Sequence, residues 1–467
     1  RGAAARLLAD VVARPHLAVL APAPMLALPR DTTFSTTLVV IGADVTVESR
    51  IEGDLVVIGG DLFLRPGARI GGRAIAIGGG VYDSFLATVG GGRIAFRDVT
   101  YVPTVVDGRV LLDQRSLLAA DSTVLAWPGL YGLRVPTYDR SDGLSLAAGP
   151  RLAAPGTGLA AEPVLTYRSH LGEIDPSLRV AWAARRGIVI EALAERGTYS
   201  NDGWARNDVL NSAATLVFGD DERNHYRATR YMGGARLERD ADVATWSAGI
   251  ALRDEDARSV GPLSGTTSEP WSMFGRDDTV RMLRPNPQVL PGRIVSVIPR
   301  LGATWADGDL TATAALDVEV PLESVGDRRF VQSTLDARVE FTALANHRFE
   351  GQLHAVLTAS DTAPPQRWAY LGGGSTLPTV EELTMGGDHL FFAEGVYEVP
   401  LPRLEIPYLG PPTVGVRYAV GSAGVGGLPR LVQNVGALVR LGIFRVELVV
   451  DPASGTTAFR LGSSAFR

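Results

Sequence analysis

The stretch that decides the fold is Arg328 to Ser360, RRFVQSTLDARVEFTALANHRFEGQLHAVLTAS, in which apolar and polar residues alternate. One alternating run extends from Leu335 to Ala343, and a second follows a turn and extends from Phe349 to Leu357. This pattern predicts a hairpin with arms of about ten residues. A tilted strand of that length crosses a bilayer core of about 30 Å. Apolar-out, polar-in alternation is typical of membrane barrels, but a soluble sheet with one wet face also shows it.

Recurrence of the pattern favours the membrane barrel. Alternating segments recur from residue 143 to residue 466 and predict about sixteen strands. A soluble protein of this size would not keep charged residues on a concealed strand face, whereas a wide barrel has a watery lumen. The mixed signs of the charges argue against a strongly ion-selective pore. The residues predicted to face the lumen are Arg179, Arg185, Arg253, Asp317, Glu319, Asp336, Arg338, Glu340, Arg445 and Glu447.

Composition narrows the function classes. The 467 residues contain no cysteine and carry a net charge of −6, so neither disulfides nor a nucleic-acid footprint is expected. No metalloprotease HExxH spacing and no Gly-x-Ser-x-Gly elbow occurs, so we predict no enzyme activity, catalytic residue, cofactor or metal site. The acidic runs at 220–222 and 254–256 are predicted to be solvated loops. The polar insertion from Asp254 to Pro291 is predicted to be an extracellular loop.

The N-terminal part contains a repeat. LVVIGAD begins at Leu38, LVVIGGD at Leu55 and AIAIGGG at Ala74, each a short β run followed by a glycine corner. Stacked coils of this kind bury a continuous apolar column, so residues 31–102 are predicted to form a short β-solenoid. Residues 1–30 are predicted to be a leader or signal remnant, with a helix packed on the solenoid as the alternative. Residues 103–135 are predicted to be a linker with a short helix near 116–120.

The phrasing of the repeats resembles a known family. Ile51-Glu-Gly-Asp-Leu and Pro66-Gly-Ala-Arg-Ile-Gly-Gly are similar to the bactofilins, which are small β-solenoids that polymerise. The resemblance covers about 70 residues. Three to four coils are few, so this bactofilin-like module is expected to cap or dock something, with a periplasmic protein as a potential partner.

The rest of the chain, residues 136–467, resembles the bacterial surface antigen barrel. This superfamily contains outer-membrane assembly factors and two-partner-secretion transporters. Tyr138-Asp-Arg-Ser-Asp-Gly-Leu resembles its first-strand motif, in which Tyr138, Arg140, Asp142 and Gly143 are the matching residues. The segment that begins at Arg206 is similar to a middle segment of these barrels. The end of the chain resembles the aromatic closing strand through Phe459 and Phe466.

The resemblance also implies a loop folded into the lumen. Its residues here are Gly372, Gly373, Gly374, Leu377, Pro378, Gly386, Gly387 and Asp388. In the assembly factors the loop tip carries an Arg-Gly-aromatic motif, but here Leu377-Pro-Thr-Val stands in its place. The arginine that docks the tip against the barrel wall is therefore expected to be missing.

These patterns together predict an all-β protein in which a transmembrane antiparallel barrel of about sixteen strands follows a β-solenoid. The expected location is the bacterial outer membrane, with outer-membrane lipid as a partner and the solenoid in the periplasm. The expected function is a channel that translocates or assembles a protein or lipid client. A passive diffusion pore and a structural anchor for a periplasmic polymer are the alternatives. The client and the oligomeric state stay open.

Overall fold

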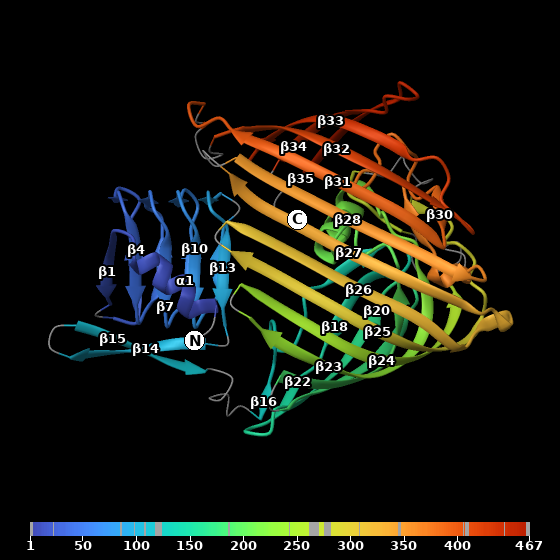
Figure 1. The fold of residues 1–467 in the computed structure, drawn as a ribbon, viewed down its shortest axis with the longest axis horizontal. Coiled ribbons are helices and arrows are strands. Elements are labelled where there is room, and N and C mark those ends of the chain that lie inside the picture. Colours follow the sequence, from blue (N-terminus) through green and yellow to red (C-terminus); the bar gives the residue numbers. More distant parts are fainter. Residues whose placement is uncertain are drawn as a thin grey trace.

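The computed structural model describes the 467-residue chain with several gaps. The residues outside the description are 1–2, 22, 85, 98, 107–108, 117–123, 185–186, 242, 261–269, 275–281, 308, 344–346, 405, 407–410, 443 and 464–467. Figure 1 shows two parts, a narrow ladder of short strands and a large curled sheet of long strands beside it.

The ladder is a parallel β-solenoid with three sheets. One sheet has the strand order β1-β4-β7-β10-β13, the second β11-β8-β5-β2 and the third β12-β9-β6-β3. The first sheet contains β1 (His16–Leu20), β4 (Thr37–Ile41), β7 (Leu55–Ile58), β10 (Ala74–Ile77) and β13 (Arg93–Phe96). The second contains β2 (Met25–Leu28), β5 (Asp44–Val47), β8 (Leu62–Leu64) and β11 (Val81–Asp83). The third contains β3 (Thr33–Phe34), β6 (Arg50–Ile51), β9 (Arg69–Ile70) and β12 (Thr88–Val89). The predicted β-solenoid is therefore confirmed.

Both faces of the three central strands of the first solenoid sheet, β4, β7 and β10, are buried, which explains their uninterrupted apolar runs. Val40 and Val57 point into the column between the three sheets, whereas Val39 and Ile58 are covered from outside. The cover consists of helix α1 (Ala3–Val12) and the hairpin of β14 (Val99–Val106) and β15 (Arg109–Ser116).

The solenoid is longer than the sequence indicated. Residues 16–20 and 25–28, which were predicted to belong to a leader, form β1 and β2 of the first coil, and α1 packs on the solenoid as in the alternative. Much of the predicted linker is the β14–β15 hairpin. Its predicted short helix lies mostly outside the described residues. The reason is physical, because the outward side chains of β4, β7 and β10 are also apolar, and α1 and the β14–β15 hairpin cover them.

We expect residues 1–116 to fold without the rest of the chain, since their two apolar clusters are closed within this range. The fragment should give a β-type circular dichroism spectrum and one cooperative melt. A random-coil spectrum would show that the solenoid depends on the large sheet.

The large sheet is antiparallel and has eighteen strands in the order β16 to β28 and then β31 to β35. Two places in the sheet are each filled by two short strands. β18 and β19 both pair with β20, so they lie one after the other along it. β17 pairs with β18 and β16 with β19, so these two lie one after the other in the next place. Eighteen strands minus these two doubled positions gives sixteen, which confirms the predicted number. The bounds are β16 (Leu125–Ala126), β17 (Thr137–Asp139), β18 (Gly143–Ala148), β19 (Arg151–Ala154), β20 (Leu159–Arg168), β21 (Glu173–Ala183), β22 (Ile188–Tyr199), β23 (Tyr226–Asp240), β24 (Ala244–Ser259), β25 (Gly292–Asp307), β26 (Leu310–Glu323), β27 (Phe330–Ala343), β28 (His347–Ser360), β31 (His389–Pro400), β32 (Thr413–Gly424), β33 (Val432–Leu441), β34 (Phe444–Val450) and β35 (Thr457–Ser463).

The two faces of this sheet differ in chemistry. The decisive hairpin is confirmed as β27 and β28, in which Leu335 pairs with Ala355 and Asp336 with His354. We call the face with Leu335 the outer face, and there large apolar side chains are exposed. Examples are Ile250 (54% exposed), Leu301 (56%), Val416 (58%) and Leu448 (59%). The face with Asp336 is the inner face, where Arg338 on β27 donates to a loop carbonyl.

The connections differ at the two ends of the strands. Most connections on the side of the solenoid are short turns, although residues 401–412 separate β31 from β32. On this side Arg6 of α1 donates to the carbonyl of Ala241 between β23 and β24. The opposite end carries loop A (200–225), loop B (260–291) and loop C (361–388). The predicted insertion from Asp254 is shorter than expected, because β24 continues to Ser259. Within the described ranges, none of the helices is long and apolar enough to cross a membrane.

Candidate functional site: the loop cluster on the inner face

Loop C packs against the inner face of β31 and β32. Its strands β29 (Ala369–Leu371) and β30 (Met385–Gly387) pair with each other. Leu371 and Leu377 are fully buried in a cluster with Leu390, Phe392 and Ala419 from the sheet. Apolar contact therefore fixes the position of the loop.

Three glycines of loop C allow close approach. Gly372 has φ +112°, which favours glycine. A Cβ atom at Gly374 would lie 2.9 Å from Nε of Arg460 on β35, and one at Gly386 would lie 2.1 Å from the ring of Tyr370.

The other predicted residues of loop C are also placed. Asp388 is fully buried and accepts hydrogen bonds from the backbone N–H groups of Ala363 and Gly426. Gly373 has φ +91°, Pro378 is half-buried, and Gly387 ends β30.

Polar contacts from β32 and β33 hold the tip of loop C. Arg417 donates to the carbonyl of Thr376 at 2.6 Å and pairs with Glu394 at 2.7 Å. The amide of Asn434 donates to Oγ1 of Thr379 at 2.7 Å. The Leu-Pro-Thr-Val tip is thus bound to the sheet without an arginine of its own.

An arginine does dock on the inner face, but it lies at the start of loop C. Arg367 is 5% exposed, and its guanidinium lies between two carboxylates of the sheet. Nη1 donates to Glu255 on β24 at 2.5 Å, and Nε donates to Glu319 on β26 at 2.8 Å. Arg230 pairs with Glu255, and Arg253 pairs with Glu319. The expectation that the docking arginine is missing holds only for the loop tip.

Loops A and B are tied to loop C by further ion pairs. Arg206 of loop A pairs with Glu222 at 2.7 Å, and Glu222 accepts from the backbone N–H of Ser375 in loop C at 2.9 Å. Arg284 of loop B pairs with Glu382 of loop C at 3.1 Å. Burial raises the pKa of Glu382 to about 8; Arg284 opposes this shift, and the carboxylates of Asp220 and Glu222 add to it.

The raised pKa of Glu382 makes the stability of the loop cluster depend on pH. Its pKa is higher in the folded protein than the usual value of about 4.3. Glu382 therefore stabilises the cluster most at low pH, and this contribution is lost as the pH rises to about 8. We expect protease cleavage in loop C to be faster at pH 9 than at pH 6. Glu382→Gln should weaken this dependence, and the neighbouring Glu381→Gln should not. Equal cleavage at both pH values in the wild type would contradict this role.

The Tyr138–Gly143 motif is a tight hairpin, because it spans β17, a turn and the start of β18. The residues that resemble a first-strand motif therefore contain a reversal of the chain. Gly143 has φ +68°, which the turn requires, and the resulting reversal turns Arg140 and Asp142 toward the loops. Arg140 is fully buried and donates to Asn286 of loop B at 2.6 Å and to the carbonyl of Arg223 at 2.9 Å. Asp142 pairs with Arg168 on β20.

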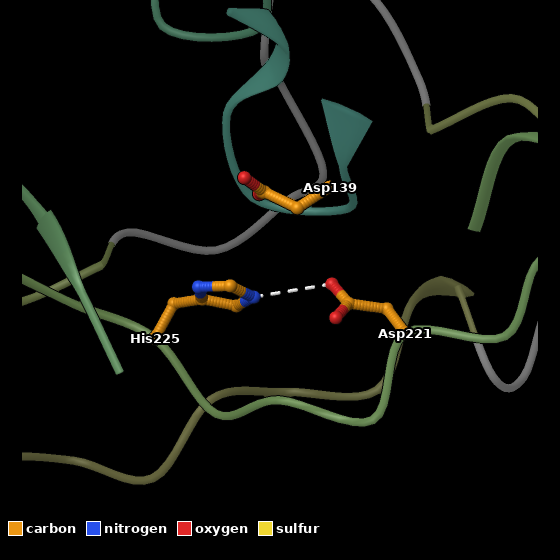
Figure 2. A group of neighbouring side chains, drawn as sticks. All are labelled: Asp139, Asp221 and His225. Carbon is orange, nitrogen blue, oxygen red and sulfur yellow. Dashed lines mark hydrogen bonds and ion pairs between the residues drawn. The ribbon is translucent and has the colours of Figure 1, made fainter. Parts of the chain in front are cut away.

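Asp139 of this hairpin lies close to Asp221 and His225 of loop A (Figure 2). Nε2 of His225 is 3.1 Å from Oδ2 of Asp221, and one potential ligand atom from each residue lies within 4.8 Å of the others. Burial alone would lower the pKa of His225, but the carboxylates of Asp221 and Asp139 raise it above its usual value. Asp221 also accepts from Asn211 and from the backbone N–H of Arg140.

These three residues have the chemistry of a metal site, but their charge is already balanced. His225, whose pKa the two carboxylates raise, pairs with Asp221, and the guanidinium of Arg140 supplies positive charge with its Nε 3.6 Å from Asp221. A divalent cation would have to displace the proton of His225. The cluster therefore acts as an ion-paired joint between the hairpin and loop A.

The other predicted residues fall into three groups. Arg253, Asp317, Glu319, Asp336, Arg338, Glu340, Arg445 and Glu447 alternate with the outer-face residues of their strands, and Arg179 lines an inner-face cavity. Phe459 is 71% exposed on the outer face of β35. Arg185 and Phe466 lie outside the described residues. The acidic runs are not simply solvated loops, since Asp221, Glu222 and Glu255 are each at most 2% exposed.

Sequence reasoning missed helix α2 (Asp208–Phe218) in loop A, because its residues were matched to a barrel segment. Two signals mark it. Asn207 caps the N-terminus by accepting from the backbone N–H of Leu210, and Gly219 ends the helix in the left-handed conformation.

Comparisons with family models and with curated proteins found no match. Among solved structures, CdiB from Acinetobacter baumannii matches with 12% identity and a TM-score of 0.40, over 78% of this chain and 65% of that one. CdiB from Escherichia coli matches with 10% identity and a TM-score of 0.41, over 78% and 67%. A bacterial polysaccharide outer membrane secretin matches with 10% identity and a TM-score of 0.30, over 71% and 91%. The chain thus spans less than two thirds of the Acinetobacter protein, and its function must be argued from its own geometry.

Proposed function

We propose that the large sheet is an outer-membrane barrel, and that it is a channel for a protein or lipid client whose lumen is closed at one end by the loop cluster. The solenoid then lies in the periplasm, and loops A, B and C lie at the extracellular end. The observation that carries this proposal is the placement of Arg367, a loop residue buried between two carboxylates on the inner face of the sheet.

The outer face supports a lipid environment. Isolated exposed apolar residues are normal on soluble proteins, but a continuous band of them is not. Here the band includes Trp182, Trp246 and Trp305, which are 43–44% exposed, together with the more exposed Leu301 and Leu448. Charged residues on this face, such as Asp254 and Arg293, lie toward the loop ends of β24 and β25, and an apolar band between charged strand ends fits a barrel wall.

The inner face supports a polar passage below the loops. A cavity of about 540 Å³ lies against the inner face of β23 to β27. Ser247, Thr304, Thr313 and Asp336 contribute to its lining, and Trp204 of loop A borders it. The lining also includes Gly302 and Ala315, so hydroxyl, charged and small apolar groups together form the wall of this passage. The loops would have to move for such a client to pass.

Cysteine labelling tests the closed lumen, because the natural chain contains no cysteine. We expect Thr379→Cys on intact cells to resist a bulky thiol reagent, since Thr379 contacts Asn434 on β33. Thr456→Cys, in an exposed turn between β34 and β35, is the matched control and should react rapidly. Rapid labelling at both sites would remove the plug and favour a diffusion pore or an anchor.

A further inference from the structure

Helix α2 buries its polar side and exposes its apolar side. Its polar stripe is buried, with Asn211 2% and Thr215 0% exposed. Its apolar stripe points away from the loop cluster, with Val209 46% and Leu216 37% exposed and Ala213 also exposed. A helix on a water-soluble protein normally buries the apolar stripe instead.

Residues of loop B extend this apolar surface. The backbone N–H groups of Met273 and Phe274 donate to the carbonyls of Leu216 and Val217 at 2.8 and 2.9 Å, which satisfies the last turn of α2. We call the combined exposed surface the apolar patch. It consists of Val209, Ala213, Leu216, Phe218, Trp271, Met273 and Phe274.

The apolar patch lies at an edge of the large sheet. Among the described strands, the register pairings of β17 are with β18 alone, because β16 pairs with β19. There the backbone N–H of Tyr138 donates to Oγ of Ser212 in α2 at 3.0 Å. The helix thus covers a strand edge that would otherwise expose unpaired backbone groups.

The register of β17 places the apolar patch next to the outer face. Tyr138 pairs with Leu144, and Leu146, two residues further along β18, pairs with Tyr167. Tyr138 therefore lies on the same sheet face as the exposed Leu144 and Tyr167. The hydroxyl of Tyr138 accepts from the backbone N–H of Trp271 at 2.8 Å and donates to its carbonyl at 2.7 Å. The start of the loop B part of the patch is therefore bound to the outer side of β17.

We propose that the apolar patch contacts the acyl chains of the membrane, so that α2 replaces a strand in the barrel wall at this edge. The inference rests on the proposed membrane location and goes beyond it. The patch contains no charged residue and continues the apolar band of the outer face across the sheet edge. A helix whose apolar stripe enters lipid keeps its polar stripe toward protein or water, as α2 does.

Three matched alanine-to-cysteine variants of the full chain test this inference. Ala213→Cys lies in the apolar patch, Ala437→Cys on the exposed outer face of β33, and Ala453→Cys in an exposed turn after β34. Each variant is labelled with a fluorescent thiol probe and reconstituted in phosphatidylcholine vesicles. Quenching by doxyl-labelled lipid is compared with quenching by iodide in the buffer.

The inference predicts that the probe at 213 loses fluorescence to doxyl lipid as much as the probe at 437, and that only the probe at 453 is quenched strongly by iodide. Iodide quenching at 213 would mean that the patch faces water, and no quenching there would mean that protein covers it. Either result would overturn the inference. If the probe at 437 is still quenched by doxyl lipid, the membrane location of the barrel would remain supported. Absence of doxyl quenching at 437 would instead refute the membrane location itself.

Discussion

Replacing Arg367 by Met should detach loop C from the inner face. The substitution leaves Glu255 and Glu319 buried next to each other without the cation that links them, although Arg230 and Arg253 still contact them. Breaking a buried ion pair by removing one partner costs about 3–5 kcal/mol. We therefore expect a large drop in the free energy of unfolding in urea, and faster protease cleavage within residues 361–388.

Arg293→Met is the matched control. Arg293 pairs with Asp254 at 2.8 Å, but its side chain is 55% exposed. An exposed pair contributes about 0–1 kcal/mol, so this variant should melt almost like the wild type. Equal effects of the two substitutions would show that Arg367 does not hold the loop.

Replacing Leu316 by Arg should have the second large effect. Leu316 lies near the middle of β26 and pairs with Leu335 and Leu301 on the outer face. A charged residue at the middle of the lipid-facing surface of a barrel costs about 2–4 kcal/mol. We expect the variant to fold poorly into lipid vesicles, as measured by the fraction that resists protease.

Ala315→Arg is its control, because Ala315 is the next residue and lines the inner-face cavity. It pairs with Asp336, whose carboxylate can accept from the new side chain. This variant should fold like the wild type. Equal loss at positions 315 and 316 would contradict the assignment of the two faces.

The sequence predicted the regular parts of the fold well. Alternation between Leu335 and Leu357 depends only on which neighbours share a strand face, so the β27–β28 hairpin could be inferred without knowledge of other strands. The glycine corners after Ile41, Ile58 and Ile77 marked the solenoid coils for the same local reason.

Features fixed by distant contacts could not be predicted in this way. Arg367 acquires its role from Glu255 and Glu319, which are 112 and 48 residues away. The polar face of α2 is buried because Asn211 bonds Asp221, which in turn holds the hairpin at Arg140. The first solenoid coil at His16 has no glycine corner like those that identified the later repeats.

Planar-bilayer conductance tests the central claim most directly. The account holds that loop C closes a membrane channel, so deletion of residues 375–385 should convert small, unsteady currents of the wild type into large, steady ones. Arg293→Met, measured in parallel, should retain the wild-type currents. Large steady currents in the wild type that the deletion leaves unchanged would contradict the closed channel and favour a passive diffusion pore.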